Sequence, residues 1–278
     1  QCDWSSDVCS SDLQGIGDEI MFASCLPDAL ACVGHCVIDC HPKLAPLFRR
    51  SFPEAVVHAG LQTDPVDWLK DYQVDAEIPS GSLPGIFRRS RSQFPAHRGY
   101  LRSDPHRVQK WRARLEELGD GLKVGISWRG GTLRSRGPLR SIDPRWMIEA
   151  LGKQGLHLVN LQYNADAAEI GVISEATGVR ISHWDEAIQD YDETAALISA
   201  LDLTFTVCTA VVHLAGALGK PGWVLAPFSP EWRYGASGEN MAWYPSARVL
   251  RQSSFGDWKP LIAEAVRRLR IEWMGAKL

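Results

Sequence analysis

Hydrophobic positions recur along this chain in two alternating patterns. Residues 18–31 carry apolar side chains at helical spacing, and the next apolar stretch, residues 36–40, is short and almost continuous. The first pattern is typical of an amphipathic helix and the second of a buried strand. Because the two patterns alternate along the sequence, they predict an α/β protein with parallel layering.

The first part of the chain begins this alternation and then loses it. Helices are expected at residues 18–31, 42–51 and 105–118, and strands at 36–40 and 54–58. Between residues 60 and 104, Pro65, Pro79, Pro84 and Pro95 interrupt the periodicity, which indicates loops and short helices near a cleft. We interpret residues 14–118 as a first domain.

The alternation resumes after a glycine-containing linker at residues 119–121. Strands are expected at 123–128, 157–162, near 179, at 203–207 and at 222–226, and helices at 143–152, 165–177, 194–201, 209–219 and 257–269. We interpret residues 119–256 as a second domain, and 257–278 as a separate C-terminal helical segment.

A hydroxyl residue and a histidine mark the start of the helix expected at 209–219. Thr209 follows the strand expected at 203–207, and His213 lies four residues further on, on the same helical face. The first N–H groups of a helix lack internal partners and its dipole adds positive charge, so Thr209, Ala210 and His213 are candidates to bind a phosphate. On pattern alone, an ordinary N-cap threonine with a packed histidine is the better explanation of the same residues.

Charge and hydrophobic content narrow the classes of function. The formal net charge is −3, which argues against general nucleic-acid binding because that usually requires a basic surface. A hydrophobic content of 45% fits a globular protein, and no apolar run reaches membrane-spanning length.

The cysteines do not form a pattern typical of metal binding. Cys36 and Cys40 would lie on one face of the strand at 36–40, about 13 Å apart at the usual rise per residue, which is too far for one metal ion. Cys25, Cys32 and Cys208 complete an odd number of cysteines outside the first thirteen residues, which favours reduced thiols in a cytosolic enzyme. We therefore expect no metal site.

Five ordered blocks of sequence resemble a known enzyme family. The blocks are residues 14–23 (QGIGDEIMFA), 124–131 (VGISWRGG), 140–142 (RSI), 209–219 (TAVVHLAGALG) and 243–245 (WYP). Together they resemble the glycosyltransferase family 9 module, which is related to the ADP-heptose:lipopolysaccharide heptosyltransferases. The resemblance is strongest to the versions that follow tetratricopeptide repeats in bacterial proteins.

This resemblance implies a fold and a reaction. The fold is GT-B, in which two Rossmann-like domains face each other across a cleft, and in which the last helix, here 257–278, crosses back to the first domain. The reaction is transfer of a sugar from a nucleoside diphosphate sugar to a hydroxyl of a glycan, lipid or protein acceptor, with inversion and without a metal. No cofactor is implied beyond this co-substrate. The family suggests a cytoplasmic location, at the inner face of the inner membrane for some members.

The resemblance also assigns roles to individual residues. Asp18 occupies the position of the catalytic base, although Asp is also a favoured N-cap residue. Arg129 and Arg140 follow the first strand of the second domain, where they are candidates to pair with phosphate oxygens. Gly216 would permit close packing on the phosphate helix. Cys208 stands where the heptosyltransferases usually have aspartate, so ADP-heptose is in doubt as the donor.

Aromatic residues between 232 and 245 form a further candidate surface. Trp232 and Tyr234 could stack on the base or the sugar of the donor. Packing of the surrounding loop would explain them equally well.

The first residues resemble a sequencing artefact. Residues 2–13 match one reading frame of a widely used sequencing adapter, so we exclude residues 1–13 from the fold prediction. The first strand of a Rossmann-like domain is expected just before Gly15, and an upstream repeat domain is expected to be missing.

Two other functions, a dehydrogenase and a non-catalytic binding module, would use parts of the same sequence. Residues 15–17 begin the G-x-G-x-x-G fingerprint of dinucleotide-binding proteins, but Ile20 occupies the third glycine position, which disfavours a dehydrogenase. A non-catalytic nucleotide- or sugar-binding module attached to a repeat scaffold is the remaining alternative, since such a module would keep the same pocket residues.

Overall fold

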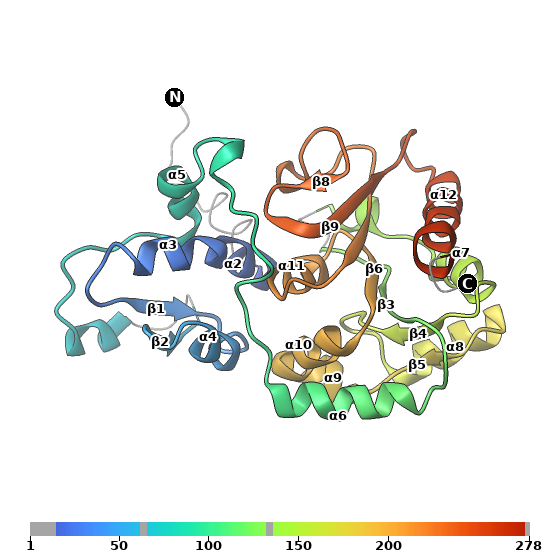
Figure 1. The fold of residues 1–278 in the computed structure, drawn as a ribbon, viewed down its shortest axis with the longest axis horizontal. Coiled ribbons are helices and arrows are strands. Elements are labelled where there is room, and N and C mark those ends of the chain that lie inside the picture. Colours follow the sequence, from blue (N-terminus) through green and yellow to red (C-terminus); the bar gives the residue numbers. More distant parts are fainter. Residues whose placement is uncertain (1–14, 62–65, 132–135, 276–278) are drawn as a thin grey trace.

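The structure is a computed structural model, and it describes residues 15–61, 66–131 and 136–275 (Figure 1). The adapter-like residues 1–13 and the strand expected before Gly15 lie outside the described residues. Within the described part, the chain forms a small first domain and a larger second domain, each built on a parallel sheet.

The first domain contains two parallel strands, β1 (Val37–Cys40) and β2 (Val56–Ala59). Its helices are α2 (Ile16–Phe22), α3 (Leu26–Leu30) and α4 (Ala45–Ser51), with a 3₁₀ turn η1 (Ala23–Cys25) between the first two. The single helix expected at 18–31 is therefore divided. Pro27 explains the division, because it has no N–H to donate to the carbonyl four residues earlier.

The proline-rich stretch consists of loops and short helical turns, as expected. Its elements are η2 (Val66–Asp71), η3 (Ser80–Ser82), α5 (Leu83–Phe87) and η4 (Arg91–Gln93). The helix α6 (Pro105–Glu116) follows, and the Asp104 carboxylate caps it by accepting N–H bonds from His106 and Arg107.

The second domain has a seven-stranded sheet in the order β5-β4-β3-β6-β7-β9-β8. The strands are β3 (Lys123–Ser127), β4 (His157–Asn160), β5 (Ile181–Ser182), β6 (Leu203–Val207), β7 (Gly222–Ala226), β8 (Asn240–Met241) and β9 (Tyr244–Arg251). All neighbouring pairs are parallel except β8 with β9. The five expected strands are confirmed, whereas β8 and β9 were not predicted.

Helices cover both faces of this sheet (Figure 1). On one face, α7 (Pro144–Gly152), α8 (Ala167–Thr177) and α12 (Lys259–Leu269) share a core with Trp223 and Leu225 of β7. On the other, α10 (Tyr191–Ala200) and α11 (Ala210–Ala217) share a core with Val224 and Ala226 of the same strand. The alternation along β7 is the two-residue period of a strand buried on both faces. The remaining short elements are α9 (Asp185–Gln189), η5 (Gly137–Arg140), η6 (Trp232–Tyr234) and η7 (Arg270–Met274).

The contacts of two helices, α6 and α12, differ from those that the predicted domain boundaries imply. The helix α6 was assigned to the first domain, but Trp111 donates to Glu193 at 2.7 Å and Arg107 donates to Asp190 at 2.8 Å, which join α6 to the second domain. The helix α12 does not cross back to the first domain. Its apolar residues, Leu261 and Ile262 among them, pack in the core that contains Met147 of α7, at the far side of the molecule in Figure 1. An amphipathic pattern shows that one face is buried but not against which partner.

The two domains are in direct contact along α2 and α11. Residues of both helices belong to a single hydrophobic core that continues through the first domain. The segment after the proline-rich stretch crosses the end of α11, where the N–H groups of Tyr100 and Leu101 donate to the Ala217 carbonyl at 2.8 and 3.0 Å. No helix in the described residues is long and apolar enough to cross a membrane.

Candidate active site

The first turn of α2 packs against the first turn of α11. Gly17 lies at the contact, because a Cβ there would be 3.0 Å from His213 Cδ2 and 3.3 Å from the Ala210 Cα. Such distances are shorter than an ordinary van der Waals contact, so a glycine is needed for the two backbones to approach this closely. The Gly-x-Gly turn thus brings Asp18, on the next residue, to the start of α11.

Thr209 is the N-cap of α11, as the sequence predicted. Its hydroxyl accepts the N–H of Val211 at 3.1 Å and lies 3.5 Å from the hydroxyl of Ser127 at the end of β3. Thr209, Ala210 and Val211 are only half-buried. The start of the helix is therefore partly accessible, although one of its donors is already satisfied by the threonine side chain.

His213 is buried on the same face of α11, with 3% of its surface exposed. Its Nδ1 lies 3.1 Å from the Tyr244 hydroxyl, and its ring contacts the ring of Tyr234. Burial, followed by the charges of Arg233 and Arg140, lowers the pKa of His213 to about 3. The ring is therefore neutral at physiological pH and contributes hydrogen bonding rather than positive charge.

Two ion pairs surround His213. The Arg233 guanidinium lies 2.7 Å from the Asp18 carboxylate, with 12% and 10% of the side chains exposed. The Arg140 guanidinium contacts the Glu231 carboxylate, and both are also largely buried. Two arginines and two carboxylates thus form a charge-balanced cluster at the contact between the domains.

The structure brings Asp18, Arg140 and His213 together at the start of α11, beside Thr209 and Ala210, but places Arg129 elsewhere. Arg129 donates to both carboxylate oxygens of Glu169 on α8, at 2.6 and 2.9 Å, and does not join the cluster. An arginine on a loop can reach several carboxylates, and sequence position does not indicate which one it pairs with.

Gly216 and Tyr234 lie in the interior of the protein, and the close packing expected at Gly216 is present. A Cβ at Gly216 would lie 2.2 Å from the Tyr244 ring, so this glycine serves packing inside the protein. Tyr234 is 2% exposed, which leaves no face of its ring for a base or sugar. Trp232 is 61% exposed and packs edge-on against Trp243, so one of the two aromatic candidates remains accessible.

Sequence reasoning missed Glu231 and Arg233 as members of the site. Both flank Trp232, in a segment that was examined only for its aromatic residues. An alternation of charged and aromatic residues, Glu-Trp-Arg-Tyr, was the available signal, because charges in a segment with buried aromatics usually need partners. Tyr244, which belongs to the block at residues 243–245, packs in the interior, where it contacts both His213 and Gly216.

The cysteines lie away from this chemistry, with one exception. Cys208 is fully buried beside Glu231 and Arg140, and burial raises the pKa of its thiol. Cys25, Cys32, Cys36 and Cys40 are free thiols in the first domain. In the parts of the chain that the structure describes, no group of three or more His, Cys, Asp or Glu side chains could hold a metal ion.

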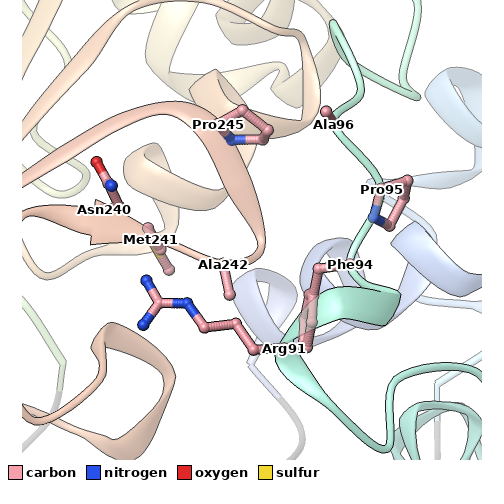
Figure 2. Close-up of a pocket in the computed structure, with 8 residues that line it drawn as sticks. All are labelled: Arg91, Phe94, Pro95, Ala96, Asn240, Met241, Ala242 and Pro245. Atoms are coloured by element: carbon pink, nitrogen blue, oxygen red, sulfur yellow. The ribbon is translucent and has the colours of Figure 1, made fainter.

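A pocket of about 340 Å³ opens between the two domains (Figure 2), and none of the charged cluster residues is among those that line it. Phe94, Pro95 and Ala96 line it from the first domain, and Asn240 to Ala242 with Pro245 from the second. Figure 2 shows the Arg91 side chain extending from the first domain toward Asn240 and Met241. Arg88, three residues before Arg91, does not line this pocket. It is buried in an ion pair with Asp28 at 2.5 Å.

A second cavity of about 570 Å³ lies between α6, α8 and β5, away from the cluster. It is lined by Arg114 and Arg180 among others. It contains none of the site residues predicted from the sequence.

Known structures share this arrangement of elements. ADP-heptose LPS heptosyltransferase II from E. coli superposes with a TM-score of 0.66 and 15% identity, covering 95% of this chain and 97% of the other. The chain has the GT-B fold. A glycosyl transferase of family 9 from Veillonella parvula gives a TM-score of 0.61 at 11% identity, covering 91% and 93% of the two chains. The E. coli heptosyltransferase WaaC bound to ADP-2-deoxy-2-fluoro heptose gives 0.54 at 12% identity, covering 93% and 96%.

Sequence comparison finds a longer relative. Protein FlbA of Caulobacter vibrioides is 35% identical over 273 residues, which cover 92% of this chain. The chain spans 45% of the length of that relative. No family model matches the chain.

Proposed function

We propose that the chain is a glycosyltransferase that moves a sugar from a nucleoside diphosphate sugar to an acceptor hydroxyl. The observation that carries the proposal is the position of Asp18, whose carboxylate meets a buried arginine beside the first turn of α11 in a GT-B fold. A base and two guanidinium groups at the start of a helix are the groups that glycosyl transfer from a diphosphate requires.

The leaving group determines which residues bind the donor. The bond between the anomeric carbon and the diphosphate oxygen breaks as the acceptor oxygen attacks, and the electron pair leaves with the diphosphate. Arg140 and Arg233 would stabilise the negative charge that develops there, together with the half-buried start of α11. The neutral His213 would act as a hydrogen-bonding group rather than as a charge.

The acceptor hydroxyl loses a proton in the same step, and Asp18 is the proposed acceptor of that proton. Attack on the side opposite the diphosphate inverts the configuration at the anomeric carbon. In this proposal the two arginines supply the stabilising charge, so the reaction is metal-independent.

The proposed donor is a nucleotide sugar, and the proposed acceptor is a hydroxyl of a glycan, lipid or protein. WaaC, a structural neighbour, has been solved with ADP-2-deoxy-2-fluoro heptose, which supports a nucleotide sugar as the donor class. Cys208 supplies no charge at the start of α11, so we propose a donor other than ADP-heptose. The pocket lined by Arg91 and Met241 opens at the contact between the domains and offers an entry for a glycan, lipid or protein acceptor.

A panel of ADP-, UDP-, GDP- and TDP-sugars tests the proposal. Wild-type protein should hydrolyse or transfer at least one donor, and Asp18→Asn should lower kcat by at least about 100-fold, the usual contribution of a general base. Arg145→Gln is the matched control, because Arg145 pairs with Asp143 at the surface of the second domain. Nucleotide-sugar binding without turnover by the wild type would instead support a non-catalytic binding module.

A further inference from the structure

Glu231 and Arg233 lie on one short turn, and each forms an ion pair with a residue of opposite charge from another segment. Arg233 pairs with Asp18 from the first domain, and Glu231 pairs with Arg140 from the second. The two residues are two positions apart at η6, so a movement of this turn would affect both ion pairs together. The turn therefore connects the proposed base to both proposed phosphate-binding residues.

The pairs leave polar atoms without partners in the interior. Within the described residues, Arg233 Nε and Glu231 Oε2 are buried and have no hydrogen-bond partner. Unsatisfied buried polar atoms cost free energy, and in native proteins they are uncommon. Arg233 thus keeps a buried N–H that its ion pair with Asp18 does not use.

Guanidinium groups bind carboxylates and phosphates with the same planar geometry. The two carboxylates in the cluster therefore compete for the arginines with any phosphate that enters. A diphosphate offers more acceptor oxygens than one carboxylate, so it can also satisfy a donor that the ion pair leaves unused.

We propose that Asp18 and Glu231 occupy the arginines in place of the donor diphosphate, and that diphosphate binding transfers Arg233 away from Asp18 and so releases the base. This inference rests on the proposed function. Before the donor binds, Asp18 is neutralised by Arg233 and is a poor proton acceptor. After the donor binds, the same carboxylate no longer pairs with Arg233 and can accept the proton of the acceptor hydroxyl. Arg233 is a positioning residue for Asp18 as well as a ligand of the diphosphate.

Affinity for a free diphosphate tests this coupling without requiring turnover. Wild type, Asp18→Asn, Arg233→Gln and the double variant would each be titrated with ADP, UDP, GDP, TDP and inorganic pyrophosphate by calorimetry. Because Asn does not compete for the guanidinium, Asp18→Asn should bind the preferred diphosphate about tenfold more tightly than the wild type. Arg233→Gln should bind it more weakly.

The double variant separates release of Arg233 from simple charge repulsion. If Asp18 acts through Arg233, the gain from Asp18→Asn should disappear in the Arg233→Gln background. If the carboxylate merely repels the diphosphate, the gain should persist, and the inference is then wrong. Circular dichroism and urea unfolding of each variant would show whether it remains folded.

Glu231→Gln provides a second, independent test at the ion pair between Arg140 and Glu231. It should also raise diphosphate affinity, because the Glu231 carboxylate no longer competes for Arg140. Unchanged affinity in both Asp18→Asn and Glu231→Gln, with diphosphate still bound, would overturn the inference and leave the proposed function standing. Absence of binding to every variant and to the wild type would count against the proposed function itself.

Discussion

At the scale of single residues, the charge of the candidate site depends on which side chains form ion pairs and on the burial of the His213 ring. Asp18 and Arg140 are the predicted residues that the structure places in one cluster, and Arg233 and Glu231 are their partners. His213 lies among these charges but is itself kept neutral by burial. The cluster therefore contains two guanidinium groups and no third positive charge on the imidazole.

Burial of His213 makes stability depend on pH. The pKa of its imidazole is about 3 in the folded protein and 6.5 ordinarily, so the unfolded chain binds more protons between these values. The stability that His213 contributes is present above pH 6.5 and is lost as the pH falls toward 3. Urea unfolding at several pH values should show this loss, at no more than about 1.4 kcal/mol per pH unit.

The variant His213→Asn isolates this effect from other titrations. It cannot take up the same proton, so its free energy of unfolding should fall less steeply on acidification than that of the wild type. Equal slopes between pH 6.5 and 4.5 would contradict the assignment of the loss to His213.

At the scale of elements, α11 is positioned by close contacts at both ends. Gly17 allows α2 to approach its first turn, and Gly216 allows the Tyr244 ring of β9 to pack against its last turn. Gly99 meets Gly219 where the segment from the first domain crosses the end of the helix. The start of α11 is thus fixed relative to both domains by backbone contacts, which is what a preorganised phosphate site requires.

Gly216→Ala should destabilise the protein. The added Cβ would lie 2.2 Å from the Tyr244 ring, and overpacking of this kind usually costs about 1–3 kcal/mol. Chemical denaturation measures the change in the free energy of unfolding.

Gly171→Ala is the matched control on a second helix. Gly171 lies inside α8, and a Cβ there meets nothing within 4 Å. Alanine is the better helix former, so this variant should gain up to about 1 kcal/mol. A Gly216→Ala protein as stable as Gly171→Ala would show that the contact with Tyr244 is not restrictive.

At the scale of the whole molecule, the two domains are joined by a shared hydrophobic core and by an ion pair between Arg50 and Asp192. Residues of α2 and α11 belong to one hydrophobic cluster. Arg50 of α4 donates to both carboxylate oxygens of the buried Asp192 on α10, at 2.8 and 2.7 Å. The first domain therefore holds its position over the second at two separate places.

Arg50→Ala should weaken the connection between the domains. It removes a bidentate partner from a buried carboxylate and should lower the free energy of unfolding by about 2 kcal/mol. The loss is moderated because Arg107 also lies 3.8 Å from Asp192. Differential scanning calorimetry measures it, with Lys70→Ala as a control at an exposed pair. An unchanged melting temperature would mean that the core alone joins the domains.

Much of the fold could be predicted from local pattern. The strands at 203–207 and 222–226 are continuous apolar runs, and Thr209 has the identity and position of an N-cap, so their local sequence is sufficient. The division of the first helix at Pro27 also had a local cause. The edge strand β8 has two residues, which is too short to produce a periodic signal.

The predicted site residues also fall into two groups, those whose role depends on neighbouring residues and those whose role depends on distant ones. By itself, the sequence determined the two-domain α/β layering, the capped start of α11 and the acid that follows the Gly-x-Gly turn, because each depends on neighbouring residues. Only the tertiary structure decided that Arg129 pairs with Glu169, that Tyr234 is buried, and that Asp18 meets Arg233. These outcomes depend on contacts between segments far apart in the chain, where long side chains choose among several partners and burial is set by packing.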